Sequence, residues 1–247
     1  TFFLQALRAS QSGGTPSPLS AIASTGLGNL LCEWNRLDQA LPHLQRGIEL
    51  GRQWNQWESL LAGYSGLARL HWAQGEQEAA FAKLDELRNR AQELDVLWIT
   101  PSIQAYHALL SARRGDLQTA ATWAENSPVS QGSAIHFMLE QDALNMTRIY
   151  ILQDRFAQAA VLAAETARSA QAGGRLGRWT EAALLHGLAL HLQGEIKLAL
   201  PHLEKALQRA LAEDYRRIFL DEGLRMAGFL RQAQIAGPNS SPGWDDG

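Results

Sequence analysis

The stretch that decides the fold is GNLLCEWNRLDQALPHL, residues 28–44. It combines a small residue (Gly28), a short polar turn (residues 35–37), an alanine (Ala40) and a leucine four positions later (Leu44). Apolar residues precede the turn at helical spacing, which predicts two helices joined by a three-residue turn. Two helices cross closely only where small side chains face each other, so we expect Gly28 and Ala40 to lie at the crossing.

The same pattern returns four more times along the chain. Its turns begin at residues 35, 75, 115, 154 and 194, which sets a repeat of about 40 residues. Five residues into each turn comes an alanine, and twelve residues before each alanine comes a small residue. The alanines are Ala40, Ala80, Ala120, Ala159 and Ala199, and the small residues are Gly28, Ala68, Ala108, Thr147 and Gly187. One helix pair cannot bury its own apolar face, so neighbouring pairs must stack.

The expected fold class is therefore all-α, an α-α superhelix of about five 40-residue helix-turn-helix repeats plus a C-terminal helix. We expect residues 1–234 to form one repeat domain, in which 1–11 end an upstream repeat, and residues 235–247 to form a linker or tail. The expected helices cover 17–34, 37–53, 56–73, 76–94, 97–113, 116–126, 134–152, 155–171, 176–193, 196–211 and 214–234.

Composition narrows the classes of function. The net charge is −3 and the pI is about 6.2, which disfavours a nucleic-acid surface, because phosphate binding needs clustered Lys and Arg. The one cysteine, Cys32, excludes an internal disulfide and predicts a reduced core thiol. No apolar stretch is long enough for a membrane span, and no targeting segment is recognisable, so we expect a cytoplasmic location without membrane contact.

A search for catalytic or metal-binding patterns gives only weak matches. GYSGL at residues 63–67 lacks the last glycine of a hydrolase elbow, and its context is the middle of a helix. His186 and His191 are five residues apart, which rotates them ~140° around a helix, so they cannot share a metal ion. The glycines at residues 173, 174 and 177 follow no strand, which predicts an inter-repeat turn. Asp221 and Glu222 are adjacent and predict a cap or a salt bridge. We therefore expect no enzyme activity, no metal and no cofactor.

The alternation of small and large residues resembles the tetratricopeptide repeat (TPR), although the usual period of that family is shorter than 40. Three segments are similar to the helical repeat domain of MalT-like transcriptional activators, the large ATP-binding members of the LuxR family. They are GLGNLLCEWNRLDQA (residues 26–40), ARRGDL (residues 112–117, followed by Trp123 and Ala124) and RIFLDEGLRM (residues 217–226).

The resemblance implies a sensor domain placed between an ATP-binding switch and a DNA-binding head. Such a domain would bind a small-molecule inducer, or a peptide or protein partner, in a concave groove. The chain has no Gly-x-x-x-x-Gly-Lys-Ser/Thr loop, so ATP binding is not carried over. DNA contact is expected only through a domain outside this chain.

The groove of tetratricopeptide domains is lined by particular positions of the first helix of each pair. Carrying these positions over predicts the ligand-binding residues Asn29, Arg69, Trp72, Tyr106, Gln141, Asn145, Arg148, Glu181 and His191. The two arginines could hold an acidic ligand, and the aromatic rings could offer flat faces to a peptide or a sugar. Two alternatives stay open. Polar residues on a solvent-facing helix side need no ligand at all, and the chain could be a generic TPR-type scaffold for peptide binding or self-association.

Overall fold

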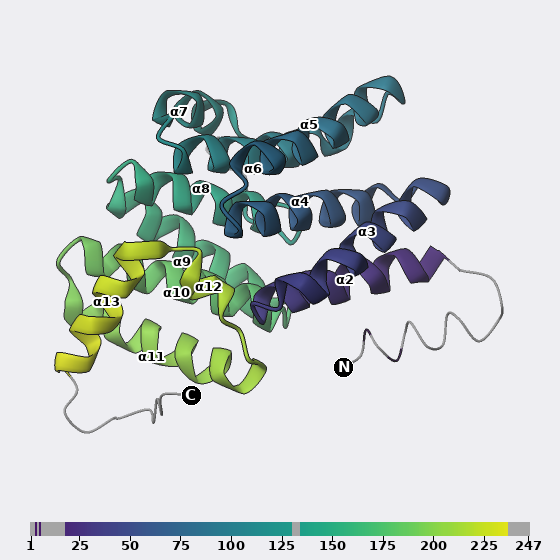
Figure 1. Cartoon of the computed structure of the whole chain (residues 1–247). Helices are drawn as coiled ribbons and strands as arrows, with labels where there is room; N and C mark the ends of the chain where they lie inside the picture. Colours follow the sequence, from purple (N-terminus) through teal and green to yellow (C-terminus); the bar gives the residue numbers. More distant parts are fainter. Residues whose placement is uncertain (1–2, 4, 6–17, 130–133, 237–247) are drawn as a thin grey trace. The chain divides into compact units, whose positions relative to one another are not determined.

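The structure is a computed structural model that describes residues 3, 5, 18–129 and 134–236 (Figure 1). Within these residues every regular element is a helix and none is a strand, which confirms the all-α prediction. The chain divides into two compact units. Unit 1 is Thr1–Ala134 with Asp214–Arg217, and unit 2 is Ile135–Glu213 with Ile218–Gly247. The expected single domain over residues 1–234 stays a prediction, and most of the segments 1–11 and 235–247 lies outside the described residues.

Unit 1 consists of successive antiparallel helix pairs. Its elements are α2 (Pro18–Glu33), α3 (Leu37–Gln53), α4 (Trp57–Ala73), α5 (Gln77–Glu93), the short 3₁₀ helix η1 (Leu97–Ile99), α6 (Thr100–Arg113) and α7 (Leu117–Asn126). Helix α7 is short because Ser127 is extended (ψ 143°) ahead of Pro128, as residues before proline usually are. The sequence predicted this early end.

Unit 2 continues the same helix pairing. Its elements are α8 (Glu140–Leu152), α9 (Phe156–Ala172), α10 (Leu176–Leu192), α11 (Ile196–Glu213), most of the short α12 (Arg217–Leu220) and α13 (Gly223–Ala236). Most predicted boundaries agree within two residues. Three differ more. Helix α6 begins three residues later than expected, because residues 97–99 form η1, and α8 begins six residues later. The expected final helix 214–234 is replaced by α12, which covers only Arg217–Leu220, and by α13, which begins at Gly223. The φ of +61° at Gly223 lies outside the right-handed helical region, so a continuous helix cannot pass through this residue.

The turns within the helix pairs use left-handed backbone at the predicted place. Positive φ is found at the first residue of all five turns, at 58° for Asn35, 83° for Gly75, 98° for Gly115, 58° for Asp154 and 87° for Gly194. Glycine, asparagine and aspartate tolerate this region best, which explains why these residue types occupy the positions. The same device serves the turns between pairs, where Asn55, Asp95, Gly174 and Asp214 also have positive φ.

Small residues lie at the helix crossings, as the repeat predicted. Ala40, Ala80, Ala120, Ala159 and Ala199 are all completely buried. A Cβ placed on Gly187 would come within 3.2 Å of the carbonyl oxygen of Ala199 and 3.4 Å of the backbone nitrogen of Leu203. The backbones of α10 and α11 therefore touch at the predicted pair of positions.

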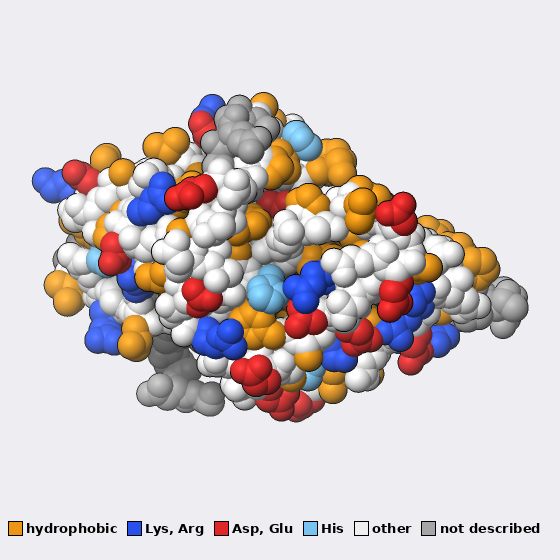
Figure 2. Space-filling model, turned by 90° about the horizontal axis from the view of Figure 1, so that it is seen from above, with side chains coloured by type: hydrophobic (Ala, Val, Ile, Leu, Met, Phe, Trp, Pro, Cys, Tyr) orange, Lys and Arg blue, Asp and Glu red, His pale blue; other side chains and the backbone are white. Residues whose placement is uncertain are grey.

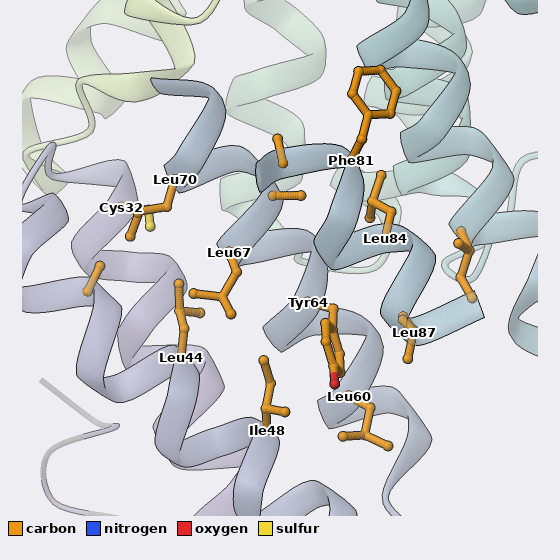
Figure 3. Close-up of a cluster of buried hydrophobic side chains, with 14 of the residues drawn as sticks. Cys32, Leu44, Ile48, Leu60, Tyr64, Leu67, Leu70, Phe81, Leu84 and Leu87 are labelled. Atoms are coloured by element: carbon orange, nitrogen blue, oxygen red, sulfur yellow. The ribbon is translucent and has the colours of Figure 1, made fainter. Parts of the chain in front are cut away.

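Larger side chains fill the space on either side of these crossings. In unit 1, Leu44 and Ile48 of α3, Leu60, Tyr64 and Leu67 of α4, and Leu84 and Leu87 of α5 form one buried cluster (Figure 3). Each such leucine stabilises the fold by about 1.5–3 kcal/mol through burial. Cys32 is a buried thiol in the same cluster. Among the described helices, none has the length and apolar character needed to cross a bilayer.

Candidate binding surface

All nine residues predicted to bind a ligand lie on the first helix of a helix pair. Unit 1 holds Asn29 on α2, Arg69 and Trp72 on α4, and Tyr106 on α6. Unit 2 holds Gln141, Asn145 and Arg148 on α8, and Glu181 and His191 on α10. We call these two sets the unit 1 strip and the unit 2 strip. The predicted grouping by helix is therefore present, while ligand binding itself stays a prediction.

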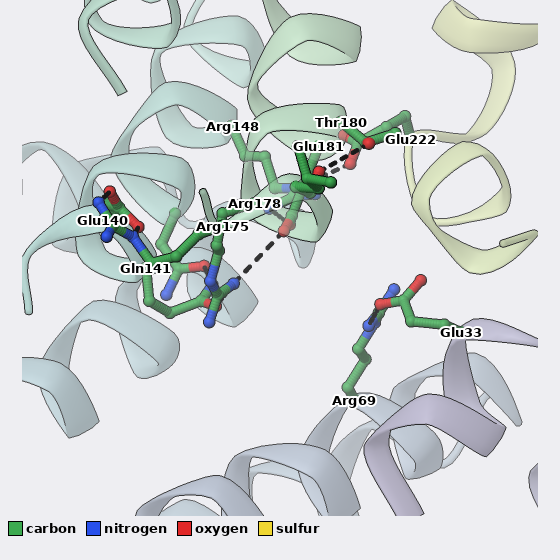
Figure 4. Close-up of polar contacts among 12 residues, drawn as sticks. Glu33, Arg69, Glu140, Gln141, Arg148, Arg175, Arg178, Thr180, Glu181 and Glu222 are labelled. Carbon is green, nitrogen blue, oxygen red and sulfur yellow. Dashed lines mark hydrogen bonds and ion pairs between the residues drawn. The ribbon is translucent and has the colours of Figure 1, made fainter. Parts of the chain in front are cut away.

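The unit 1 strip joins α2 to α4 through polar contacts. The Asn29 side-chain amide donates to the Ala62 carbonyl at 3.1 Å. A Cβ on Gly66 would lie only 2.5 Å from Asn29 Oδ1. The absence of a side chain at Gly66 therefore leaves room for the Asn29 amide. The guanidinium of Arg69 pairs with Glu33 of α2 (Figure 4). Trp72 and Tyr106 are partly buried and pack against the unit 1 core, so part of each ring stabilises the fold.

Arg148 is the centre of the unit 2 strip (Figure 4). Only 6% of its side chain is exposed, and it contacts two carboxylates. Its Nη1 lies 2.8 Å from Glu181 Oε1 of α10, and its Nε donates to Glu222 Oε1 at 2.7 Å. Glu222 lies in the break between α12 and α13. Its ion pair with Arg148 confirms the salt-bridge role predicted for this residue. Two carboxylates around one guanidinium are a strong, charge-assisted arrangement.

The amides of the unit 2 strip continue the network toward solvent. The Gln141 amide donates to Asn145 Oδ1 at 3.1 Å, and Arg178 donates to Gln141 Oε1. Arg178 also lies 3.4 Å from Glu181, and 40% of its side chain is exposed. The Asn145 Nδ2 atom is buried and has no hydrogen-bond partner among the described residues. An unsatisfied buried donor is costly, and such groups are often found at functional sites.

A second ion pair lies at the start of α8. Arg175 grips the carboxylate of Glu140 with two hydrogen bonds, from Nε at 2.9 Å and from Nη2 at 2.7 Å, while Ser169 Oγ donates to the same group at 2.8 Å. Burial opposes ionisation of Glu140, but the donors of Arg175 and Ser169 outweigh it and lower the pKa of this carboxyl. Glu140 therefore stays charged although it is buried.

His191 faces the C-terminal helix. Its ring stacks on Phe229 of α13, with centroids 4.6 Å apart and planes 16° from parallel. Burial lowers the pKa of this imidazole, so the neutral ring is favoured against the phenyl group. His191 thus packs against α13.

Sequence reasoning missed Glu140, Arg175, Arg178 and Glu222 as members of the polar network. Arg175 and Glu222 lie in turns, and their partners are 35 and 74 residues away. Helical periodicity links only residues three or four apart, so it carries no signal for such pairs.

The weak catalytic and metal-binding matches of the sequence can be placed in the structure. Ser65 of the GYSGL segment lies within α4, and its hydroxyl points to the Ala62 carbonyl at 3.4 Å. No group of three metal-ligating side chains occurs in the part of the chain that the structure describes. On the face shown in Figure 2, acidic and basic side chains alternate. The arrangement suits recognition by hydrogen bonds and ion pairs.

Comparison with known proteins agrees with this architecture. The family described as the MalT-like TPR region matches residues 2–236, nearly the whole chain. No individual curated protein matches the sequence. Tetratricopeptide repeats are helical modules that commonly bind other proteins, and this chain has their arrangement of successive antiparallel helix pairs. The chain belongs to the MalT-like TPR region family.

Proposed function

We propose that this chain is the non-catalytic sensing region of a MalT-like transcriptional regulator. The unit 2 strip binds an inducer or a partner, and binding is passed to a DNA-binding head elsewhere in the protein. The family match supports this role, because the resemblance places such repeats between a nucleotide switch and a DNA-binding part.

One observation carries the proposal. Among the described residues, every charged residue that is fully buried lies on α8, namely Glu140, Asp142 and Arg148. Burying charge is expensive, and a buried ion pair is often no more stabilising than apolar side chains of the same size. A concentration of such groups on one first helix therefore favours binding as the reason for their presence.

The side chains indicate the class of ligand. Arg148, Arg175 and Arg178 are planar donors suited to carboxylates or phosphates, and Gln141 and Asn145 can both donate and accept. Arg69 and Arg148 already pair with carboxylates of this chain. An acidic ligand therefore competes with these internal glutamates, and a ligand rich in hydroxyl or amide groups uses Gln141 and Asn145.

Isothermal titration calorimetry tests the proposal. The chain is titrated with a panel of sugars, carboxylated metabolites and acidic peptides. We expect one class to bind saturably, with Arg148→Ala and Arg178→Ala each weakening binding about tenfold or more, because charged hydrogen bonds are lost. Arg168→Ala is the matched control, since this arginine is on the second helix α9 with 76% of its side chain exposed. Equal loss in the control would contradict the assignment.

A self-association scaffold is the second candidate, and exposed apolar side chains favour it. Trp54, Leu94, Leu97 and Trp98 are between 43% and 61% exposed and lie at the inter-pair turns of unit 1. Exposed apolar groups near one another often mark protein contacts. Sedimentation velocity tests this candidate: dimerisation weakened by Trp98→Gln, with no binding in calorimetry, would favour the scaffold over the sensor.

A further inference from the structure

The C-terminal helix α13 rests on unit 2 through one face only. Met226 and Phe229 are buried on that face, whereas Leu224 and Ile235 on the other are 87% and 83% exposed. A Cβ on Gly228 would meet no atom of the described residues within 4 Å, so none of them packs against the outer face at its centre. Terminal elements with a single packed face are the first to open in native proteins.

Several contacts hold this helix in place. The Phe229 ring stacks on His191 of α10, and Met226 is buried. Arg225 donates to the Ile151 carbonyl and lies over the Phe156 ring, 5.6 Å from its centroid. Arg225 Nη2 lies 2.9 Å from Asp154 in the turn between α8 and α9, where both groups reach solvent. Glu222 is the deepest polar contact, with 7% of its side chain exposed, and it contacts Arg148.

The two carboxylates on Arg148 differ in how they are held. Glu181 projects from α10, which packs against both α9 and α11, so its backbone is fixed within unit 2. Glu222 projects from a break in the chain, and Gly223 next to it has left-handed backbone (φ +61°). Of the two, Glu222 is the carboxylate that can leave without disturbing the packed helices.

We propose that α13 is a detachable cap of unit 2 and that the Glu222–Arg148 ion pair is its latch. Arg148 also belongs to the unit 2 strip, so occupancy of the strip and docking of the cap are coupled through one guanidinium. A ligand group that binds Arg148 in place of Glu222 releases α13 from unit 2. Conversely, when α13 is docked, Glu222 occupies Arg148 and competes with the ligand. The coupling to a ligand rests on the proposed function, whereas the latch is a property of the chain alone.

Hydrogen–deuterium exchange of the whole chain, read by mass spectrometry, tests the latch. Glu222→Gln removes the charge at constant size, and we expect amides of residues 223–236 to exchange about tenfold faster, since the charge-assisted contact with Arg148 is weakened while Arg148 stays paired with Glu181. Peptides of α9, α10 and unit 1 keep their wild-type protection. Glu222→Asp keeps the charge on a shorter side chain and gives an intermediate rate.

Two matched controls define the result. Glu181→Gln removes the other carboxylate from the same arginine and leaves the cap latched, so residues 223–236 stay as protected as in the wild type. Glu204→Gln makes the same change at an exposed position of α11 and alters nothing. Unchanged exchange of α13 in Glu222→Gln, equal opening in Glu181→Gln, or loss of protection throughout α8–α11 each overturns the latch. None of these outcomes affects the calorimetric test of ligand binding, so the two proposals fail separately.

Discussion

Two glycines show how differently the same residue type is used in this chain. A Cβ on Gly28 would lie 2.7 Å from Leu44 Cγ and 3.0 Å from the Leu44 backbone nitrogen, at the crossing of α2 and α3. A Cβ on Gly228, in the middle of α13, would meet no atom within 4 Å in the part of the chain that the structure describes. The first glycine is required by close packing of two backbones, and the second is not required by packing.

The pair Gly28→Ala and Gly228→Ala tests this difference. Gly28→Ala forces a clash in the core and is expected to lower the free energy of unfolding by about 1–3 kcal/mol. Gly228→Ala is expected to raise it by about 0.5–1 kcal/mol, because alanine favours the helix without a steric cost. Urea unfolding followed by circular dichroism measures both. Equal effects of the two changes would show that the crossing is looser than described.

Residue patterns revealed the crossings but not the ion pairs. Gly28, Ala40 and their equivalents recur every 40 residues, so a periodic requirement was visible in the sequence. Arg148 and Glu222 are 74 residues apart and occur once, so nothing local could connect them. The sequence could thus assign the predicted binding residues to the first helices of the pairs, while the partners of those residues needed the fold, and their role in binding stays a prediction.

At the scale of elements, the pair α10 and α11 contains a contact between two partly buried histidines. The rings of His186 and His202 have centroids 4.2 Å apart. Burial, with a smaller contribution from the neighbouring His202, lowers the pKa of His186 from 6.5 to about 4. Burial also lowers the pKa of His202. The contact therefore favours two neutral rings and is weakened by acid.

The sign of the pH effect follows from linkage. Between pH 6.5 and about 4 the unfolded chain binds a proton at His186 that the folded chain does not. The contribution of this group to the free energy of unfolding is therefore complete above pH 6.5 and is lost as the pH falls toward 4. The slope from this one group is at most about 1.4 kcal/mol per pH unit. We expect His186→Gln to flatten the pH dependence of urea unfolding over this interval, and the exposed His136→Gln to leave it unchanged. An unchanged slope in His186→Gln would contradict the neutral-pair description.

The last predicted helix is interrupted between α12 and α13. Residues 214–234 have helical periodicity, yet Gly223 interrupts them and Glu222 turns toward Arg148. The burial of Met226 and Phe229 offsets the helical hydrogen bonds lost at the break. Periodicity detects a helical tendency, but it does not detect a tertiary contact that outweighs it.

At the scale of the whole molecule, the residues that stabilise the helix pairs differ from those that form the candidate binding surface. Small residues at the crossings and leucines beside them hold each unit together. Polar and charged residues of the first helices, concentrated on α8 in unit 2, form the candidate binding surface. We infer that the cluster of Arg148, Glu181 and Glu222 serves ligand binding and its coupling to α13, and that the fold does not need this cluster for its stability.

The triple variant Arg148→Met, Glu181→Leu and Glu222→Leu tests this claim most directly. It replaces the ion cluster with apolar side chains of similar volume and removes the cost of burying charge. The measurement is the free energy of unfolding in urea, compared with the wild-type chain. We expect the free energy of unfolding of the triple variant to equal or exceed that of the wild type. A free energy of unfolding lower by about 3 kcal/mol or more would show that the cluster is needed for stability and would contradict its assignment to binding.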